Sequence, residues 1–130
     1  MRMHNRGFTL IELLIVVVII GILVSIVVPK FANGKERAMV SAMRSDLHNL
    51  VTAQEAYFSN GNLYYNGPVP DPSFSYSVSE NVTVTLQNVS PSGWGATATR
   101  LGTPRTCAVY VGTGGPIAPA TDEGVPACTP

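Results

Sequence analysis

The sequence predicts an α+β chain in which a long N-terminal α-helix packs on a C-terminal antiparallel β-sheet of about four strands. Two observations carry this prediction. Residues 8–28 hold 17 apolar residues in 21, which is typical of a helix that is apolar on every side. Gly and Pro become frequent only later, with 18 of the 72 residues from 59 to 130, where they separate short alternating stretches.

The composition of the 130-residue chain excludes several classes of protein. Eight basic and eight acidic residues give a net charge of zero, so a dedicated electrostatic nucleic-acid binder is disfavoured. Only 12% of the residues are charged, about half the usual share of ~25% for a soluble domain. The length corresponds to one domain and disfavours a large enzyme.

The apolar block is long enough to cross a membrane once, because 21 helical residues reach about 31 Å. A cleaved signal peptide is the first alternative, with Arg2 and Arg6 as its charged start. The block is too long for that reading, and Pro29 and Lys30 follow it in place of a small-residue cleavage site. A buried helix of a soluble protein is the second alternative, and too little chain remains to cover it.

Glu12 is the discordant residue of this block, because a carboxylate in a membrane-spanning segment is costly. Its position one turn from Phe8 reduces the cost. The residue is either a charge that reaches the membrane surface, favoured by the helix dipole, or a carboxylate that awaits a positive partner.

The residues GFTLIELL, from Gly7 to Leu14, follow a short basic leader, and this segment resembles the N-terminus of type IV prepilins. The resemblance implies a pilin-like fold and a leader of residues 1–7 that prepilin peptidase removes between Gly7 and Phe8. It further implies N-methylation of Phe8 and pairing of Glu12 with the amino terminus of a neighbouring subunit.

Gly21 and Pro29 match the helix-perturbing positions of that family, between which the helix unwinds in assembled filaments. Both residues weaken a helix, Gly by about 1 kcal/mol relative to Ala and Pro by loss of an amide donor. The alternative is that both are tolerated kinks of a membrane helix. The predicted organisation is therefore a leader (1–7), a membrane and polymerisation helix (8–29) and a remainder (30–130).

Cleavage would supply the positive partner that Glu12 lacks, because it exposes an ammonium group at Phe8. In an apolar bundle an unpaired carboxylate is penalised, so pairing would select the axial register of each subunit.

The distribution of positive charge conflicts with the orientation implied by the resemblance. Two basic residues precede the block, and four follow it: Lys30, Lys35, Arg37 and Arg44. The positive-inside rule alone would place the C-terminal part in the cytoplasm. In the family that the segment resembles, the N-terminus of the helix lies in the cytoplasm. This orientation and the two cysteines discussed below favour a C-terminal part outside the cytoplasm.

Beyond Pro29 the helix is expected to continue to about Phe58 as an amphipathic half, with His48 on its surface. Four alternating stretches predict strands, with Trp94 as a core anchor. They are Phe74–Val78, Val82–Leu86, Trp94–Ala98 and Cys107–Val111.

Cys107 and Cys128 enclose 20 residues that are rich in Gly and Pro. A disulfide bond closing this loop would contribute about 3 kcal/mol and would indicate an oxidising compartment. Two free thiols are the alternative. Type IV pilins also carry a C-terminal disulfide loop.

No catalytic motif, phosphate-binding loop or zinc spacing is present, so we expect no enzyme activity, cofactor or metal. Asp122 and Glu123 as calcium ligands are a weak alternative. The sequence predicts a structural subunit that is inserted in the cytoplasmic membrane with its C-terminal part outside. Prepilin peptidase and the assembly machinery would then bring it into a homo-oligomeric extracellular type IV pilus.

Two rival functions stay open. A pseudopilin of a type II secretion system has the same N-terminus, but its major form usually has a calcium site and no such disulfide. A monomeric membrane-anchored binding module is the other rival, and Arg100 and Arg105 give only weak support for nucleic acid as its ligand. Motility, adhesion, DNA uptake and electron transfer are all filament functions among which the sequence does not choose.

Overall fold

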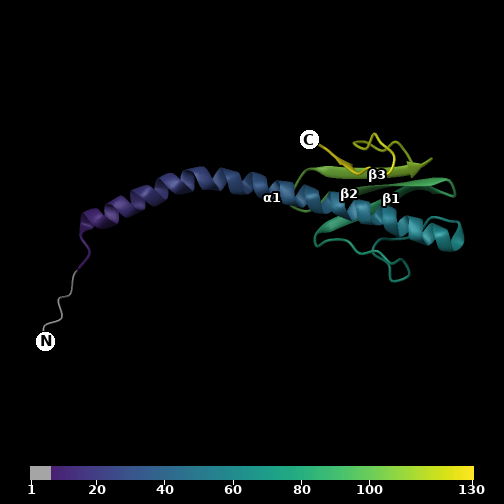
Figure 1. The fold of residues 1–130 in the computed structure, drawn as a ribbon, viewed down its shortest axis with the longest axis horizontal. Helices are drawn as coiled ribbons and strands as arrows, with labels where there is room; N and C mark the ends of the chain where they lie inside the picture. The colour runs from purple at the N-terminus through teal and green to yellow at the C-terminus, as the bar shows by residue number, and fades with distance from the viewer. Residues whose placement is uncertain (1–6) are drawn as a thin grey trace, which may run out of the picture. The chain divides into compact units, whose positions relative to one another are not determined.

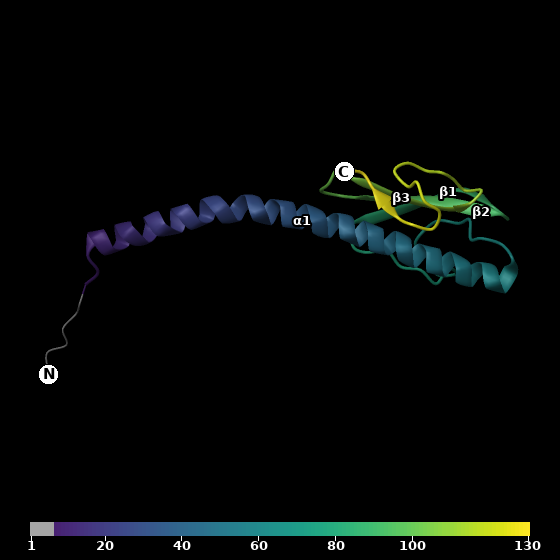
Figure 2. The same cartoon turned by 45° about the horizontal axis from the view of Figure 1, so that its top comes forward.

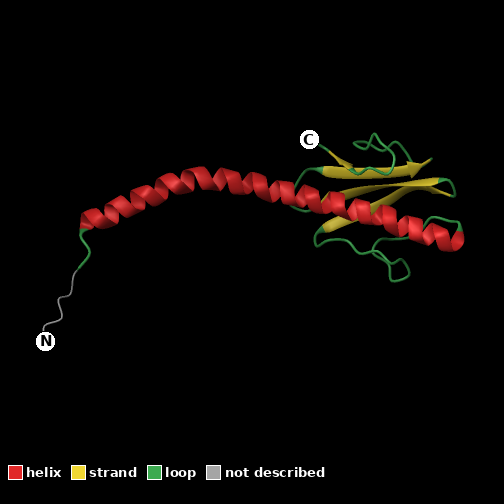
Figure 3. Ribbon diagram, in the orientation of Figure 1, coloured by secondary structure: helices red, strands yellow, loops and turns green. Residues whose placement is uncertain are grey.

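The structure is a computed structural model that describes residues 7–130. The chain forms a helix, α1 (Leu10–Gly61), followed by four strands (Figures 1 and 3). The strands are β1 (Val82–Ser90), β2 (Gly93–Arg100), β3 (Thr106–Gly112) and β4 (Ala127–Cys128). The chain divides into two compact units, one that ends at Lys35 and one from Glu36 to Pro130. The α+β class and a four-stranded antiparallel sheet are as predicted.

In the first unit, α1 presents apolar side chains on every side. Every large apolar side chain from Leu10 to Val28 is exposed, and Gly21 and Pro29 both lie inside the helix. In the part of the chain that the structure describes, α1 is the one helix long and apolar enough to cross a membrane. The predicted start at Phe8 is two residues early, because Thr9 caps the helix.

In the second unit, the last part of α1 lies along one face of the sheet (Figures 1 and 2). Met43, Leu47 and Leu50 are fully buried there, at the spacing of one helix face. Asp46 and Gln54 are buried polar residues of the same face. The helix ends later than predicted, at Gly61, because Asn62 adopts a positive φ of 53° and its amide donates to the carbonyl of Phe58.

The sheet is antiparallel throughout, with the strands in the order β1-β2-β3-β4. The strand register places one row of side chains on the helix-facing side of the sheet: Val84, Ala98, Cys107 and Cys128. A second row contains Leu86, Ala96 and Val109. The central strand thus contributes alanines, whose small side chains leave room for the buried leucines of α1. Trp94 is fully buried beside them, as predicted.

The predicted strand Phe74–Val78 is wrong. This segment lies in the loop of residues 62–81 between α1 and β1, and the fourth strand is Ala127–Cys128 instead. Phe74 and Tyr76 are buried and Val78 is half-buried, but the two aromatic residues belong to a cluster of aromatic rings rather than to a sheet ladder. The Tyr76 amide bonds to the carbonyl of Phe74, which is a local turn.

The loop of residues 62–81 is fastened to α1 by two buried polar side chains. The Gln54 amide donates to the Tyr65 carbonyl over 3.0 Å and accepts from the Tyr65 amide over 2.8 Å. The Asp46 carboxylate accepts hydrogen bonds from the Ser79 amide and hydroxyl, and the Tyr76 hydroxyl donates to the Asp46 carbonyl. Both ends of this loop are therefore held against α1 by buried polar groups whose hydrogen bonds are satisfied.

Candidate functional site

The amino-terminal end of α1 is built around a reciprocal capping box. The Glu12 amide donates to the Thr9 hydroxyl over 3.3 Å, while Glu12 Oε2 accepts from the Thr9 amide and hydroxyl over 2.9 and 2.8 Å. The Thr-x-x-Glu spacing gives this geometry, since residue N3 reaches back to the N-cap. The role of Thr9 was not predicted from the sequence, although the Thr-x-x-Glu spacing is the pattern that indicates a capping box.

The carboxylate of Glu12 is thereby held at the start of the helix. Both hydrogen bonds that the carboxylate accepts end on Oε2, so Oε1 is left for another donor. Phe8 precedes the helix and is 83% exposed, and a Cβ added at Gly7 would meet no atom within 4 Å. Arg2 and Arg6, the basic residues of the predicted leader, lie outside the described residues.

Gly21 and Pro29, the predicted helix-perturbing positions, are both accommodated within α1. A Cβ added at Gly21 would meet nothing within 4 Å. Pro29 has no amide hydrogen, so the Ser25 carbonyl, four residues earlier, lacks its usual helical hydrogen bond. The Ser25 hydroxyl donates to the Ile22 carbonyl over 2.7 Å. The two positions therefore lie in a stretch with one backbone hydrogen bond fewer.

Cys107 and Cys128 form a disulfide bond, and they face each other directly across β3 and β4. Cys107 is fully buried and belongs to the hydrophobic core between the sheet and α1. The bond is therefore part of the core and holds the C-terminal residues on the edge of the sheet. The chain contains no further cysteine.

The loop of residues 113–126 folds back over the outer face of the sheet, away from α1. Ile117 lies against Gly95, and the Tyr110 ring lies against Gly115. The Tyr110 hydroxyl donates to the Thr121 carbonyl over 3.0 Å. Gly114 passes so close to the Trp94 backbone that no Cβ would fit there. The glycines of this loop thus permit close packing on the sheet.

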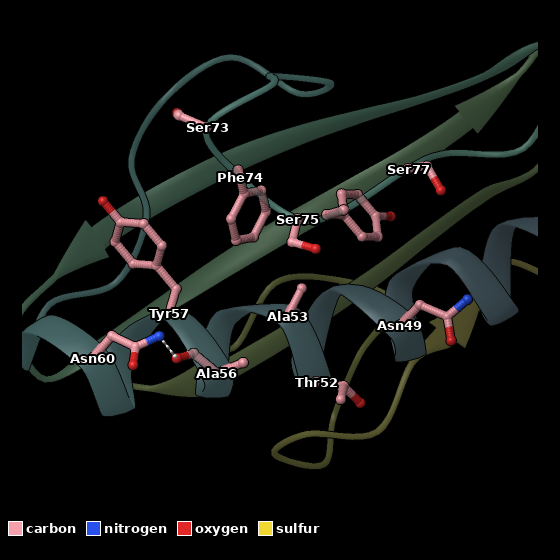
Figure 4. Close-up of a pocket in the computed structure, with 11 residues that line it drawn as sticks. Asn49, Thr52, Ala53, Ala56, Tyr57, Asn60, Ser73, Phe74, Ser75 and Ser77 are labelled. Atoms are coloured by element: carbon pink, nitrogen blue, oxygen red, sulfur yellow. Dashed lines mark hydrogen bonds between the residues drawn. The ribbon is translucent and has the colours of Figure 1, made fainter.

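A groove of about 570 Å³ lies between α1 and residues 73–77 (Figure 4). It is lined by uncharged side chains that carry amides, hydroxyls and aromatic rings. Along α1, the Asn60 side-chain amide donates to the Ala56 carbonyl over 3.1 Å. The groove can offer hydrogen bonds and aromatic surface, but no ionic contact.

Within residues 7–130, no group of three or more His, Cys, Asp or Glu side chains could hold a metal ion. The weak calcium alternative rested on Asp122 and Glu123. Glu123 instead accepts a hydrogen bond from the Gly112 amide over 2.6 Å, and Asp122 accepts one from the Thr121 hydroxyl. His48 is exposed on α1.

Sequence reasoning also missed an ion pair that fastens α1 to the sheet. Arg105 Nε lies 2.7 Å from Glu36 Oε1, and Arg105 Nη1 donates to the Thr129 carbonyl. No sequence signal links residues 69 positions apart. The indole nitrogen of the buried Trp94 has no hydrogen-bond partner among the described residues.

The fold and the site together define a class: a pilin-like protein with a capped apolar helix and a disulfide-closed head. Comparison with known proteins agrees with this class. The family model of the prokaryotic N-terminal methylation motif matches residues 2–28.

Several characterised proteins are similar to the chain. The type IV major pilin protein PilA of Myxococcus xanthus is 50% identical over 61 residues, which cover 47% of this chain and 28% of PilA. The type IV major fimbrial protein FimA of Dichelobacter nodosus is 44% identical over 61 residues, 47% of this chain and 39% of FimA. Type II secretion system core protein G of Pseudomonas aeruginosa is 31% identical over 93 residues, 72% of this chain and 61% of that protein.

The chain is thus similar to type IV pilins and to core protein G, and it spans well under two thirds of the length of PilA and FimA. These relatives are named as pilus, fimbrial and secretion-system proteins, and none of them as an enzyme.

Proposed function

We propose that the chain is a structural subunit of a bacterial type IV pilus, anchored in the cytoplasmic membrane before assembly into an extracellular filament. The observation that carries the proposal is a helix with exposed apolar side chains on every side, whose apolar part from Leu10 to Val28 lies within the match to the methylation motif. Such a helix needs either lipid or other copies of itself, and a filament core supplies the second environment. The similarity to PilA and FimA supports this choice.

Processing would precede assembly. In this proposal prepilin peptidase removes residues 1–7 and leaves a methylated ammonium group on Phe8. Phe8 and Gly7 lie before the start of α1 and are exposed, so the Gly7–Phe8 bond is accessible. The leader, the polymerisation helix (8–29) and the head that follows would then have separate roles.

Glu12 would set the axial register of assembly. The capping box fixes the carboxylate through Oε2 and leaves Oε1 to accept the Phe8 ammonium of a neighbouring copy. In a helical bundle that excludes water, an unpaired Glu12 carboxylate costs free energy. A subunit that docks at an axial position where Glu12 has no partner is therefore disfavoured. Gly21 and Pro29 would provide a stretch of helix that extends more easily than the rest.

A pseudopilin of a type II secretion system is the second candidate. The similarity to core protein G covers 72% of the chain, more than the 47% covered by PilA. An oxidising compartment suits both candidates, since the periplasm and the cell exterior both permit disulfides. The Cys107–Cys128 bond favours the pilus subunit because type IV pilins carry a C-terminal disulfide loop, which major pseudopilins usually lack.

The proposal is tested in the native cell by deleting the gene and imaging surface filaments. We expect filaments to be lost, secreted-enzyme activity to be retained, and filament subunits to begin with methylated Phe8 by mass spectrometry. Filaments whose subunits keep residues 1–7, or a loss of secretion with surface filaments intact, would overturn it.

A matched pair of substitutions at Glu12 separates a filament subunit from a monomeric binding module. Glu12→Gln keeps an oxygen for the capping box but removes the charge, whereas Glu12→Asp keeps the charge. A filament subunit should lose assembly in the Gln variant and retain more of it in the Asp variant. A binding module should be indifferent to both changes.

A further inference from the structure

The exposed charges on the second unit's part of α1 follow an unusual order. Arg37, Arg44 and Glu55 are all exposed. Because 18 residues make five helical turns and 11 make about three, these three side chains lie along one face of the helix. The face is positive at its start and negative at its end.

The acidic residues next to the two arginines are already engaged. Glu36 pairs with Arg105 over 2.7 Å, and the Asp46 carboxylate is buried against Ser79. Among the described residues, neither Arg37 nor Arg44 forms an ion pair. The start of this face therefore carries positive charge without an internal partner.

The negative end of the face is formed by Glu55. Glu55 Oε1 lies 3.5 Å from the Tyr64 hydroxyl. Glu55 is exposed and forms no ion pair among the described residues. The end of this face therefore carries negative charge without an internal partner.

We propose that Glu55 of one copy pairs with Arg44 of one neighbouring copy and with Arg37 of a copy further along, in parallel, axially staggered contacts. This inference rests on the proposed function, since copies inserted in one membrane are parallel. If two parallel copies lay at the same height, residues of like charge would face each other and repel. A shift along the helix of about 16 Å brings Arg44 of one copy beside Glu55 of its neighbour, and a shift of about 27 Å brings Arg37 there.

The contact uses different surfaces on the two copies, so it does not close on itself. Repetition of such a contact generates an open helical filament rather than a dimer. The charge order therefore disfavours clustering of copies side by side in the membrane and favours staggered addition. It also accounts for two of the four cations that conflict with the positive-inside rule, because they would serve contacts between subunits.

The experiment is a charge exchange in the full-length chain, expressed in cells that lack the native gene. Arg44→Glu and Glu55→Arg are made singly and together, and the yield of sheared filaments is measured relative to the subunit pool in the membrane. Glu80→Arg is the matched control, because Glu80 is exposed, lies before β1 and makes the same charge change. Thermal unfolding of each variant in micelles reports whether the head still folds.

We expect each single variant to lower the filament yield about fivefold, since it creates repulsion at both contacts of every subunit; fivefold corresponds to about 1 kcal/mol. The double variant should return to within about twofold of the wild type, as should Glu80→Arg. A double variant no better than the poorer single variant would overturn the pairing while leaving the proposed function intact. Absence of filaments from the wild type would overturn both.

Discussion

Gln54 offers the sharpest test of how the head is held together. Its side chain is fully buried, and its amide forms two hydrogen bonds to the backbone of Tyr65, which is itself only 7% exposed. Replacement by Leu keeps a similar volume but removes both partners. The Tyr65 amide and carbonyl would then be buried without hydrogen bonds.

The expected loss of stability follows from those two groups. An unsatisfied buried donor or acceptor costs about 1–3 kcal/mol, so Gln54→Leu should destabilise the second unit by about 2–5 kcal/mol. The added apolar burial offsets a part of this. For a unit of this size, we expect the melting temperature to fall by about 10 °C or more.

The measurement is urea and thermal unfolding of the full-length chain in detergent micelles, followed by near-UV circular dichroism. Gln87→Leu is the matched control, because Gln87 makes one hydrogen bond, to Thr97, on a half-buried position of the sheet. Its cost should stay near 0.5 kcal/mol. A Gln54→Leu variant as stable as Gln87→Leu would refute the argument that this pairing fastens the loop to α1.

Three further predictions concern other parts of the molecule. Replacing Cys107 and Cys128 by Ala should cost about 3 kcal/mol, and reductant in the unfolding assay should lower the stability of the wild type but not of the variant. Thr9→Val should lower filament yield by removing the cap that orients Glu12, whereas Thr9→Ser should keep it; equal yields would contradict the positioning role. Burial, and then the Asp46 charge, raise the pKa of Tyr76 above its ordinary 10.0, so stability should fall as pH rises above about 10; the fall should be shallower in Tyr76→Phe, as pH-dependent unfolding can show.

The sequence predicts the helix and the sheet well because their periodicity is strong. It fails at Phe74–Val78, where the alternation typical of a strand arises because the apolar side chains face α1 and the aromatic cluster. It fails again at β4, whose two residues are too few to show a pattern and are placed by pairing with β3.

The candidate assembly segment is readable from sequence, while its geometry is only partly so. The Thr9-x-x-Glu12 spacing is local, so the capping box could have been predicted from the four residues alone. Gln54 fits the apolar stripe by spacing, but its partner in Tyr65 depends on the path of a loop. Partners such as Glu36 and Arg105 are far apart in the chain and have no local signal.

The Cys107–Cys128 bond also decides how much chain the head can release under mechanical load. The 20 residues between the cysteines form a closed ring, so a pulling force transmitted through the backbone bypasses them. At 3.3–3.6 Å per residue, they represent about 70 Å of contour length that stays hidden while the bond is oxidised. A head stretched in an oxidising environment would therefore lengthen in a shorter step than the same head after reduction.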